Sequence, residues 1–449
     1  MTTRITIRHS YMFGSKPGPA EALDRLAYFM LCGFLFVLPW EEAPQLGGFA
    51  IGRWLASAAL GIAITRLLVS GRSRKPSGVH FLLLGLILLS GLSLFWTVDP
   101  DATMVRVGTY AQLLAAVWLM WELAPAEIRV LGLMRSYAFG IFFAALLTIR
   151  NYASGTTAAQ LSAAQGIDKW EEGRYSISGV NENDLGLMLA MCIPIIIYFA
   201  IRSRGVWMKL FFWLQLAACV AAILLTASRG AAVSAAIALL MLPLSLARLG
   251  PSQKIAVTLA CVTVIFGGVV FAPADVWTRL AQFQTELTQG TLTNRTYIWA
   301  AGLTALRDHA FIGVGAGAYG ATILPAVGLP YPAHNTFLSI LVELGAVGAL
   351  LFTGLLAGLY YTASRMQYLE RCLWFTVLLT WTTGVMALTW EYHKPTWVMF
   401  GLLLAHAYSR RLKIVLSPVP LRSKMKYTAS AAPRNVVLDQ ATEARPVPV

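Results

Sequence analysis

The sequence is poor in charged residues, and this shortage is its most informative feature. Asp, Glu, Lys and Arg make up 12% of the 449 residues, against about 25% in an ordinary soluble domain. Hydrophobic residues make up 57%, and such a composition cannot cover a surface that faces water. Soluble DNA-binding proteins and disordered chains are therefore excluded. The chain has only five cysteines, with no C-x-x-C pair, which excludes a secreted disulfide scaffold. A polytopic membrane protein remains.

Acidic residues are scarcer than basic ones, 21 against 35, which gives a formal charge of +14. In a soluble protein this excess would indicate a nucleic-acid partner, but in a membrane protein Lys and Arg gather in cytoplasmic loops. If the N-terminus is cytoplasmic, about 25 of the 35 basic residues lie on that side, including those of a basic tail at residues 412–449. We therefore predict that both termini are cytoplasmic, that these cations set the topology and contact membrane lipid, and that no nucleic acid is bound.

Long apolar runs recur along most of the chain. A helix needs about 20 residues to cross the hydrocarbon core of a bilayer, and about twelve runs approach this length. The prediction is an all-α, polytopic membrane protein in which residues 1–449 form a single integral membrane domain. The predicted spans are 23–40, 49–70, 79–97, 103–122, 130–150, 184–201, 207–227, 230–247, 255–272, 334–361, 371–390 and 395–409.

Two of the predicted outer loops are long enough to carry a function. They cover residues 151–183 and residues 273–333, and the second contains a helical stretch from about Arg295 to Arg307. The predicted inner loops are short. Chemistry on an aqueous face is therefore expected on the outer side.

Several apparent motifs have simpler structural interpretations. Gly315, Gly317 and Gly320 match G-x-G-x-x-G, but the strand and βαβ unit of a nucleotide site are missing. We interpret these glycines as giving backbone flexibility to a loop that re-enters the membrane surface. Neither H-E-x-x-H nor cysteine spacing typical of a metal site occurs. We predict no metal and no cofactor.

Acidic residues at the outer ends of the spans leave two alternatives open. Asp99 and Asp101 could hold a divalent metal with a sugar diphosphate, but Asp-Pro-Asp between helices is more typical of a turn followed by a helix cap. Glu41 and Glu42 follow the first span. They are equally compatible with a general base and with solvated charges at the interface.

Three outer segments carry the candidate chemistry. In the first, Thr226-Ala227-Ser228-Arg229-Gly230, the turn between two spans is so short that Arg229 must lie at the outer interface. An arginine there is costly without a partner, so it is a candidate functional residue. The alternative is an arginine that snorkels to lipid phosphates.

The second segment, around Asn294 and Arg295, lies in the large outer loop. Asn294 is a good N-cap, and Arg295 would then occupy a first helical turn, where a cation opposes the helix dipole. That placement makes sense if an anion binds there. The alternative is a solvated arginine on an amphipathic helix.

The third segment, Tyr331-Pro332-Ala333-His334-Asn335, precedes the longest apolar run. His334 and Asn335 open that span at its positive end, a natural site for a phosphate, and histidine can exchange a proton near neutral pH. Glu343 lies about 180° around the helix from His334, so we expect it to pair with another helix.

A weaker candidate is the segment Asn181-Glu182-Asn183 at the start of another span, whose amides could hold sugar hydroxyls.

These motifs occur in a characteristic order: N-E-N at 181–183, T-x-S-R-G at 226–230, N-R-x-x-x-W at 294–299, G-x-G-x-G at 313–317 and H-N at 334–335. With twelve predicted spans, this order resembles the O-antigen ligase and polymerase superfamily. The resemblance implies a GT-C-type glycosyltransferase with a large helical periplasmic loop. Such an enzyme moves glycan from a polyprenyl diphosphate carrier to an acceptor on the periplasmic face of the bacterial inner membrane.

Within the superfamily the sequence is most similar to the lipopolysaccharide O-antigen ligases. The resemblance then implies undecaprenyl diphosphate-linked O-antigen as donor and lipid A-core as acceptor. It also implies that Arg229 and Arg295 hold the diphosphate and that His334 acts as a base or as a phosphate ligand. The further residues expected to position substrate are Asn181, Asn183, Ser228 and Asn335.

Three alternatives stay open. An O-antigen polymerase would show a second large periplasmic loop with more arginine than residues 151–183, and a pilin oligosaccharyltransferase would carry a further periplasmic domain. From a different class, a transporter of lipid-linked solutes would need ionisable residues at mid-membrane and inverted repeats, whereas the charges here gather at the outer edge. An inverting, metal-independent ligase is the preferred hypothesis.

Overall fold

The computed structural model describes residues 18–41, 51–164, 173–240, 250–271 and 295–416, together with positions 274, 277 and 278. Helices make up nearly all of the regular structure in these ranges, and no strand occurs in them. The elements are α1 (Pro19–Val37), η1 (Leu38–Trp40), α2 (Ile51–Ser70), α3 (Gly78–Leu92), η3 (Ser93–Phe95), α4 (Pro100–Leu123), α5 (Glu127–Ala153), α6 (Ala158–Ala163), α7 (Glu182–Arg202), α8 (Val206–Leu225), α9 (Arg229–Leu240), α11 (Pro251–Phe271), α13 (Arg295–Ala305), α14 (Tyr319–Val327), α15 (Thr336–Ser364), α16 (Tyr368–Gly384) and α17 (Lys394–Leu416).

Every predicted span overlaps one of these helices, but α16 ends at Gly384, before the end of the predicted span 371–390. Residues 49, 50, 241–247 and 272 of the predicted spans lie outside the described part of the chain. Within the described ranges, seven helices are long and apolar enough to cross a membrane, namely α1 with η1, α2, α3 with η3, α5, α7, α8 and α15. The prediction of a helical, multi-pass membrane protein is confirmed. The number twelve stays a prediction.

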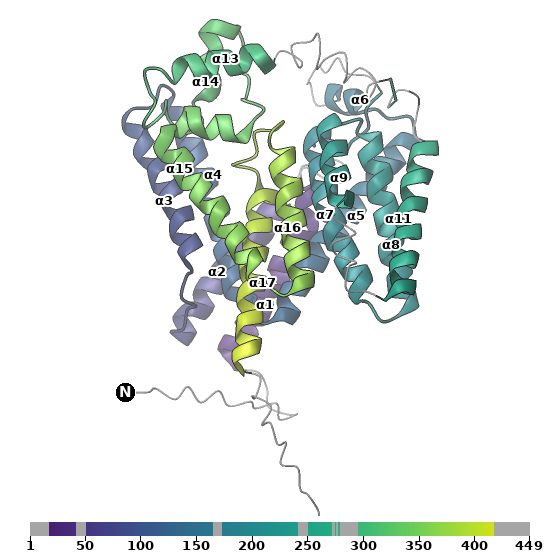
Figure 1. Ribbon diagram of the computed structural model, residues 1–449. Coiled ribbons are helices and arrows are strands. Elements are labelled where there is room, and N and C mark those ends of the chain that lie inside the picture. The colour runs from purple at the N-terminus through teal and green to yellow at the C-terminus, as the bar shows by residue number, and fades with distance from the viewer. Residues whose placement is uncertain are drawn as a thin grey trace, which may run out of the picture.

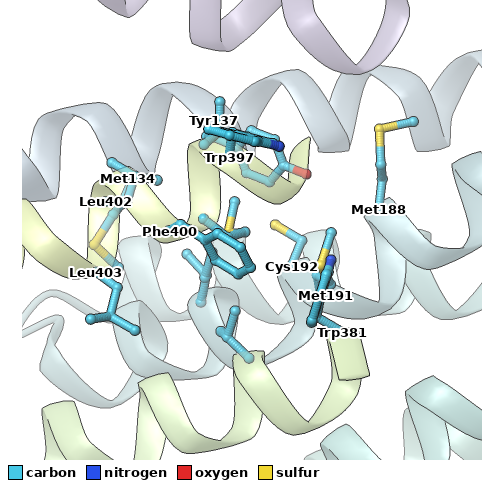
Figure 2. Packing of buried hydrophobic residues seen from close by; sticks show 14 of the residues in the cluster. Met134, Tyr137, Met188, Met191, Cys192, Trp381, Trp397, Phe400, Leu402 and Leu403 are labelled. Atoms are coloured by element: carbon cyan, nitrogen blue, oxygen red, sulfur yellow. The ribbon is translucent and has the colours of Figure 1, made fainter. Parts of the chain in front are cut away.

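Helix α7 forms the centre of the bundle, in contact with α5, α8, α9 and α16 (Figure 1). Its sequence is hydrophobic on all sides, as expected for a helix with no exposed face, and 89% of its most apolar window is buried. Figure 2 shows how Met188, Met191 and Cys192 of this helix pack near aromatic side chains of α16 and α17. Trp381 and Phe400 meet edge to face at 5.2 Å. A rigid core thus holds the helix ends in fixed positions.

The two ends of the bundle differ in character. At the lower end in Figure 1, where α17 ends, basic residues are ion-paired; Asp24, for example, lies 3.3 Å from Arg66, which also bonds Glu122 at 2.6 Å. At the upper end, the short helices α13 and α14 lie above α15 and the beginning of α4. These short helices belong to the segment predicted as the large outer loop.

Helix α15 is broken near its upper end, and the break attaches the loop segment 310–315 to the bundle. Gly345 has φ +65°, and a Cβ atom there would lie 2.3 Å from the carbonyl carbon of Phe311. Only glycine allows this close approach and this backbone conformation. The amide of Val314 then donates to the carbonyl of Val342 at 3.0 Å. The glycine-rich segment therefore serves backbone docking, and its re-entry at a membrane surface stays a prediction.

Candidate functional site

The upper end of the bundle holds the segment before α15 against helix α13. The indole nitrogen of Trp299 donates to the carbonyl oxygen of Ala333 at 2.8 Å, and the hydroxyl of Tyr319 donates to the carbonyl of Ile298 at 3.0 Å. Ile298, Tyr319 and Ala333 are also buried together in a small apolar cluster. The first turns of α13 are thereby fixed beside His334.

His334 has an unusual backbone conformation, with φ +48°. A positive φ is uncommon outside glycine and is retained only where surrounding contacts enforce it. The next residue, Asn335, is the N-cap of α15, and its side-chain oxygen accepts from the amide of Leu338 at 3.0 Å. His334 is thus held at the helix entrance by the cap behind it and by the Trp299 bond to its neighbour Ala333.

Arg295 is the first described residue of α13, and Asn294, the predicted N-cap, lies outside the described residues. The structure brings Arg295 and His334 together. Burial, and next the positive charge of Arg295, lower the pKa of His334 to about 4. The imidazole is therefore neutral at physiological pH and able to accept a proton.

Arg229 opens α9 after a tight turn in which Ala227 has φ +48°. The turn is fixed by Ser228, whose hydroxyl donates to the side-chain oxygen of Asn183 at 2.8 Å and accepts from the amide of Ala231 at 3.4 Å. Ser228 and Asn183 thus form one hydrogen-bonded group at the starts of α9 and α7, and Arg229 directly follows Ser228.

Arg174 completes this group and is a residue that sequence analysis did not single out. Its guanidinium is buried and donates to the carbonyl of Thr226 and to the side-chain oxygen of Asn183, both at 2.9 Å. Asn181 is the exposed N-cap of α7 and accepts from the amide of Asn183 at 2.9 Å. The oxygens of both asparagines are therefore used in holding the fold.

The loop between α16 and α17 connects the two groups. Thr336, directly after the α15 cap, donates to the carbonyl of Leu388 at 2.9 Å and accepts from the amide of Trp390 at 2.7 Å. The indole of Trp390 donates to Asp184 of α7 at 2.7 Å. On the other side, a Cβ added at Gly230 would lie 3.6 Å from the loop residue Ala387. The loop therefore contacts the starts of three helices, α15, α9 and α7.

A buried ion-pair network lies beside this loop. Arg106 of α4 bonds the carboxylates of Glu343 in α15 and Glu391 in the loop, each at 3.1 Å, and its guanidinium stacks over the ring of Tyr392 at 3.9 Å. Glu343 also accepts from the amide of Gly317 at 2.7 Å. The expectation that Glu343 pairs with another helix is confirmed.

The remaining acidic candidates have structural roles. Asp99 caps α4 by accepting from the amide of Ala102 at 3.0 Å, which is the turn-and-cap interpretation of the Asp-Pro-Asp sequence. Glu41 forms an ion pair with Lys394 at the start of α17, whereas Glu42 lies outside the described residues. Among the residues that the structure describes, no three His, Cys, Asp or Glu side chains gather as metal ligands.

Neither Arg106 nor Arg174 lies in one of the sequence motifs that indicate the candidate site. Arg106 is the fourth residue of the predicted span 103–122, where an arginine requires a partner, and that signal was present in the sequence. Arg174 bonds Asn183, nine residues later, and the carbonyl of Thr226, 52 residues later. No local pattern indicates such a pairing.

Residues 214–353 match the Wzy_C family, described as O-antigen ligase. The matched segment runs from α8 into α15 and includes Ser228, Arg229, Arg295, His334 and Asn335. No curated protein matches the chain. The resemblance to the O-antigen ligase and polymerase superfamily is confirmed.

Proposed function

We propose, on the premise that the chain carries an O-antigen ligase domain of the Wzy_C family at residues 214–353, that it is a lipopolysaccharide O-antigen ligase. The enzyme transfers O-antigen polysaccharide from undecaprenyl diphosphate to the lipid A-core acceptor. It is a GT-C-type glycosyltransferase of the bacterial inner membrane, with both termini cytoplasmic and the site at the upper end of Figure 1 facing the periplasm.

One observation supports this proposal above the others: three helices begin at the candidate residues. Arg229 is the first residue of α9, Arg295 is the first residue of α13, and His334 directly precedes the N-cap of α15. A helix N-terminus is electropositive and favours a bound anion, and an arginine there adds to that attraction. A lipid diphosphate supplies that anion, and bidentate contacts from the two guanidinium groups suit its oxygens.

The reaction needs a base and a stabilised leaving group. In the proposed step, the neutral imidazole of His334 accepts the proton of an acceptor sugar hydroxyl as its oxygen attacks the anomeric carbon of the donor. The bond between the anomeric carbon and the phosphate oxygen breaks, and undecaprenyl diphosphate leaves with the bonding electrons. Attack opposite the leaving group inverts the anomeric carbon. Arg229 and Arg295 stabilise the charge that develops on the diphosphate.

The proposed substrate-positioning residues Asn181, Asn183, Ser228 and Asn335 lie around these groups. Asn183 and Asn335 use their side-chain oxygens in protein hydrogen bonds, so their amide nitrogens are the groups proposed to donate to phosphate or sugar oxygens. Ser228 and Asn181 set the starts of α9 and α7. Their proposed role is to hold these donors in place.

The test is to replace His334, Arg229 and Arg295 by alanine, one at a time, in cells and to examine the lipopolysaccharide. Loss of O-antigen from lipid A-core, with undecaprenyl-linked polymer accumulating, is the expected result. Matched controls are His309→Ala and Arg307→Ala, two exposed side chains just after α13, which should leave the lipopolysaccharide unchanged.

Other outcomes identify the alternatives. Acceptor carrying a single repeat unit in a strain that lacks the protein would indicate an O-antigen polymerase, and loss of glycan from a protein would indicate an oligosaccharyltransferase. Donor that stays on the cytoplasmic face would indicate a transporter. Normal attachment of polymer in the His334→Ala strain would refute the role assigned to His334.

A further inference from the structure

A polar hollow of about 350 Å³ lies next to the segment that leads to His334. Small-molecule sites in proteins have volumes of about 300–1,000 Å³, so one sugar ring fits the hollow. Its walls come from α4, α14, α15, residues 330–333 and the loop after α16. Ala333, which forms part of the wall, directly precedes His334 in the chain.

The charges of the hollow do not suit a diphosphate. Its charged lining residues are Asp99, Glu343 and Arg106, and Arg106 already bonds Glu343 and the buried Glu391 at 3.1 Å each. The carboxyl groups therefore outnumber the guanidinium that faces them. A dianion is repelled here, whereas Arg229 and Arg295 attract it at the starts of α9 and α13.

A hydroxyl without a hydrogen-bond partner indicates the kind of ligand that the hollow could bind. Thr389 lines the hollow and is 7% exposed, yet its hydroxyl has no hydrogen-bond partner among the described residues. A buried hydroxyl without a partner costs free energy, and a ligand that bonds it would recover that cost. Ser339 and Glu343 also line the hollow and add a hydroxyl, which donates to Glu391, and a carboxylate, which accepts from Arg106 and from the amide of Gly317. A neutral ligand with many hydroxyl groups matches this mixture of donors and acceptors.

We propose that this hollow binds the terminal sugar ring of the acceptor and presents its hydroxyl to His334. The proposal rests on the proposed ligase function and adds the location of the acceptor. Donor and acceptor then occupy opposite sides of the His334 segment. The diphosphate lies on the arginine side, and the sugar that attacks lies on the carboxylate side.

Two substitutions test the site in different ways. Thr389→Val removes the hydroxyl and keeps the shape. Because the hydroxyl bonds no described residue, a purely structural role predicts unchanged or higher thermal stability. Ala321→Leu projects a larger side chain from α14 into the hollow, since Ala321 lines it. The matched control is Ala326→Leu, an exposed alanine on the same helix.

The experiment measures steady-state transfer by the purified full-length protein in detergent, with undecaprenyl diphosphate-linked O-antigen and lipid A-core varied in turn. Loss of one hydrogen bond predicts that Thr389→Val raises the KM for lipid A-core about threefold to tenfold. Filling the hollow predicts a rise of about tenfold or more for Ala321→Leu. The KM for the donor and all parameters of Ala326→Leu should stay unchanged.

Each outcome has a distinct meaning. A raised KM for the donor alone would overturn the proposal, because the hollow would then hold the first sugar of the O-antigen. Unchanged KM values in both variants, with the wild-type protein active, would also overturn it. If the wild-type protein transfers no glycan at all, the proposed function itself fails.

Discussion

The positive charge of Arg295, at the start of α13, acts on the imidazole of His334, which lies at the entrance to α15. Together with burial, it lowers the pKa of His334 to about 4. The two residues are 39 positions apart in the sequence and are joined through the bond from Trp299 to Ala333. The same arginine that is proposed to hold the diphosphate therefore also keeps the proposed base unprotonated.

This relationship predicts the pH dependence of transfer. A group with a lowered pKa loses its proton-accepting form only when the pH falls through that lower value, so kcat/KM should remain high at pH 5 and fall near pH 4. An ordinary histidine would lose activity near about pH 6.5. In the Arg295→Gln variant the fall in kcat/KM on the acidic side of the profile (the acidic limb) should occur at a higher pH. The reason is that the positive charge of Arg295, which disfavours the imidazolium, is gone.

The control for this profile is Arg295→Lys, which keeps the charge and should keep the acidic limb low. Arg307→Gln, at an exposed arginine beyond the end of α13, should leave the whole profile unchanged. An acidic limb near the ordinary histidine value in the wild-type enzyme would contradict the role of His334 as the base.

Asn183 offers a way to separate folding from substrate binding. Its side-chain oxygen accepts from Arg174 and Ser228, and an aspartate can accept both bonds, whereas a leucine can accept neither. We expect Asn183→Asp to keep the melting temperature while it raises the donor KM about tenfold, since a carboxylate replaces the amide donor beside the proposed diphosphate. Differential scanning fluorimetry and donor titrations measure the two effects.

Asn183→Leu and Arg174→Met should instead lower stability. Each leaves buried hydrogen-bonding groups unpaired, at a cost of about 2–4 kcal/mol. If Asn183→Asp transfers glycan with an unchanged donor KM, the asparagine has a structural role only.

The sequence allowed the membrane class, the helix positions and the candidate residues to be predicted because each depends on local information. Hydrophobic length identified the spans, and the residues at helix starts identified Arg229, Arg295 and His334. The left-handed φ of His334 could not be predicted, because it depends on contacts of its neighbours with other elements. Helix α14 was missed because it is nine residues long and contains Pro325, so it has no long periodic pattern.

The predicted span 371–390 shows a second limit. Helix α16 ends at Gly384, because the following backbone bonds Thr336 instead of continuing its own helix. Non-helical backbone is tolerated at such a depth when other protein groups satisfy it. An apolar sequence does not show that helical hydrogen bonds are replaced by bonds to Thr336, since Thr336 lies on another helix.

Transfer is predicted to be independent of a divalent metal, because the proposed mechanism assigns the charge on the diphosphate to Arg229 and Arg295. Activity of the purified protein should be the same with and without EDTA when donor and acceptor are dispersed in detergent. The dispersion of lipid A-core should be checked separately, since EDTA also removes ions from this lipid. Loss of activity in EDTA that Mg²⁺ restores would contradict the prediction.

The ion-pair network of Arg106 should be essential for stability. Arg106→Met leaves Glu343 and Glu391 buried without their cation, and removing one partner of a buried pair costs about 3–5 kcal/mol. The side chains are 14%, 3% and 1% exposed, respectively, so water cannot replace the arginine. Adding Glu343→Gln to Arg106→Met should recover part of the melting temperature. Equal melting temperatures for the wild type and Arg106→Met would show that the network does not stabilise the fold.

Thr336 is predicted to position His334 through the loop after α16. Its fully buried hydroxyl bonds the carbonyl of Leu388 and the amide of Trp390. Thr336→Val leaves both backbone groups without this partner, so we expect a loss of about 2–4 kcal/mol in stability. We also expect a lower kcat, because the start of α15 is no longer fixed against the loop.

Thr362→Val is the matched control on the same helix, since the hydroxyl of Thr362 bonds the carbonyl of Gly358 within its own turn. If the two variants lose stability and kcat equally, the contact between Thr336 and the loop does not position the site.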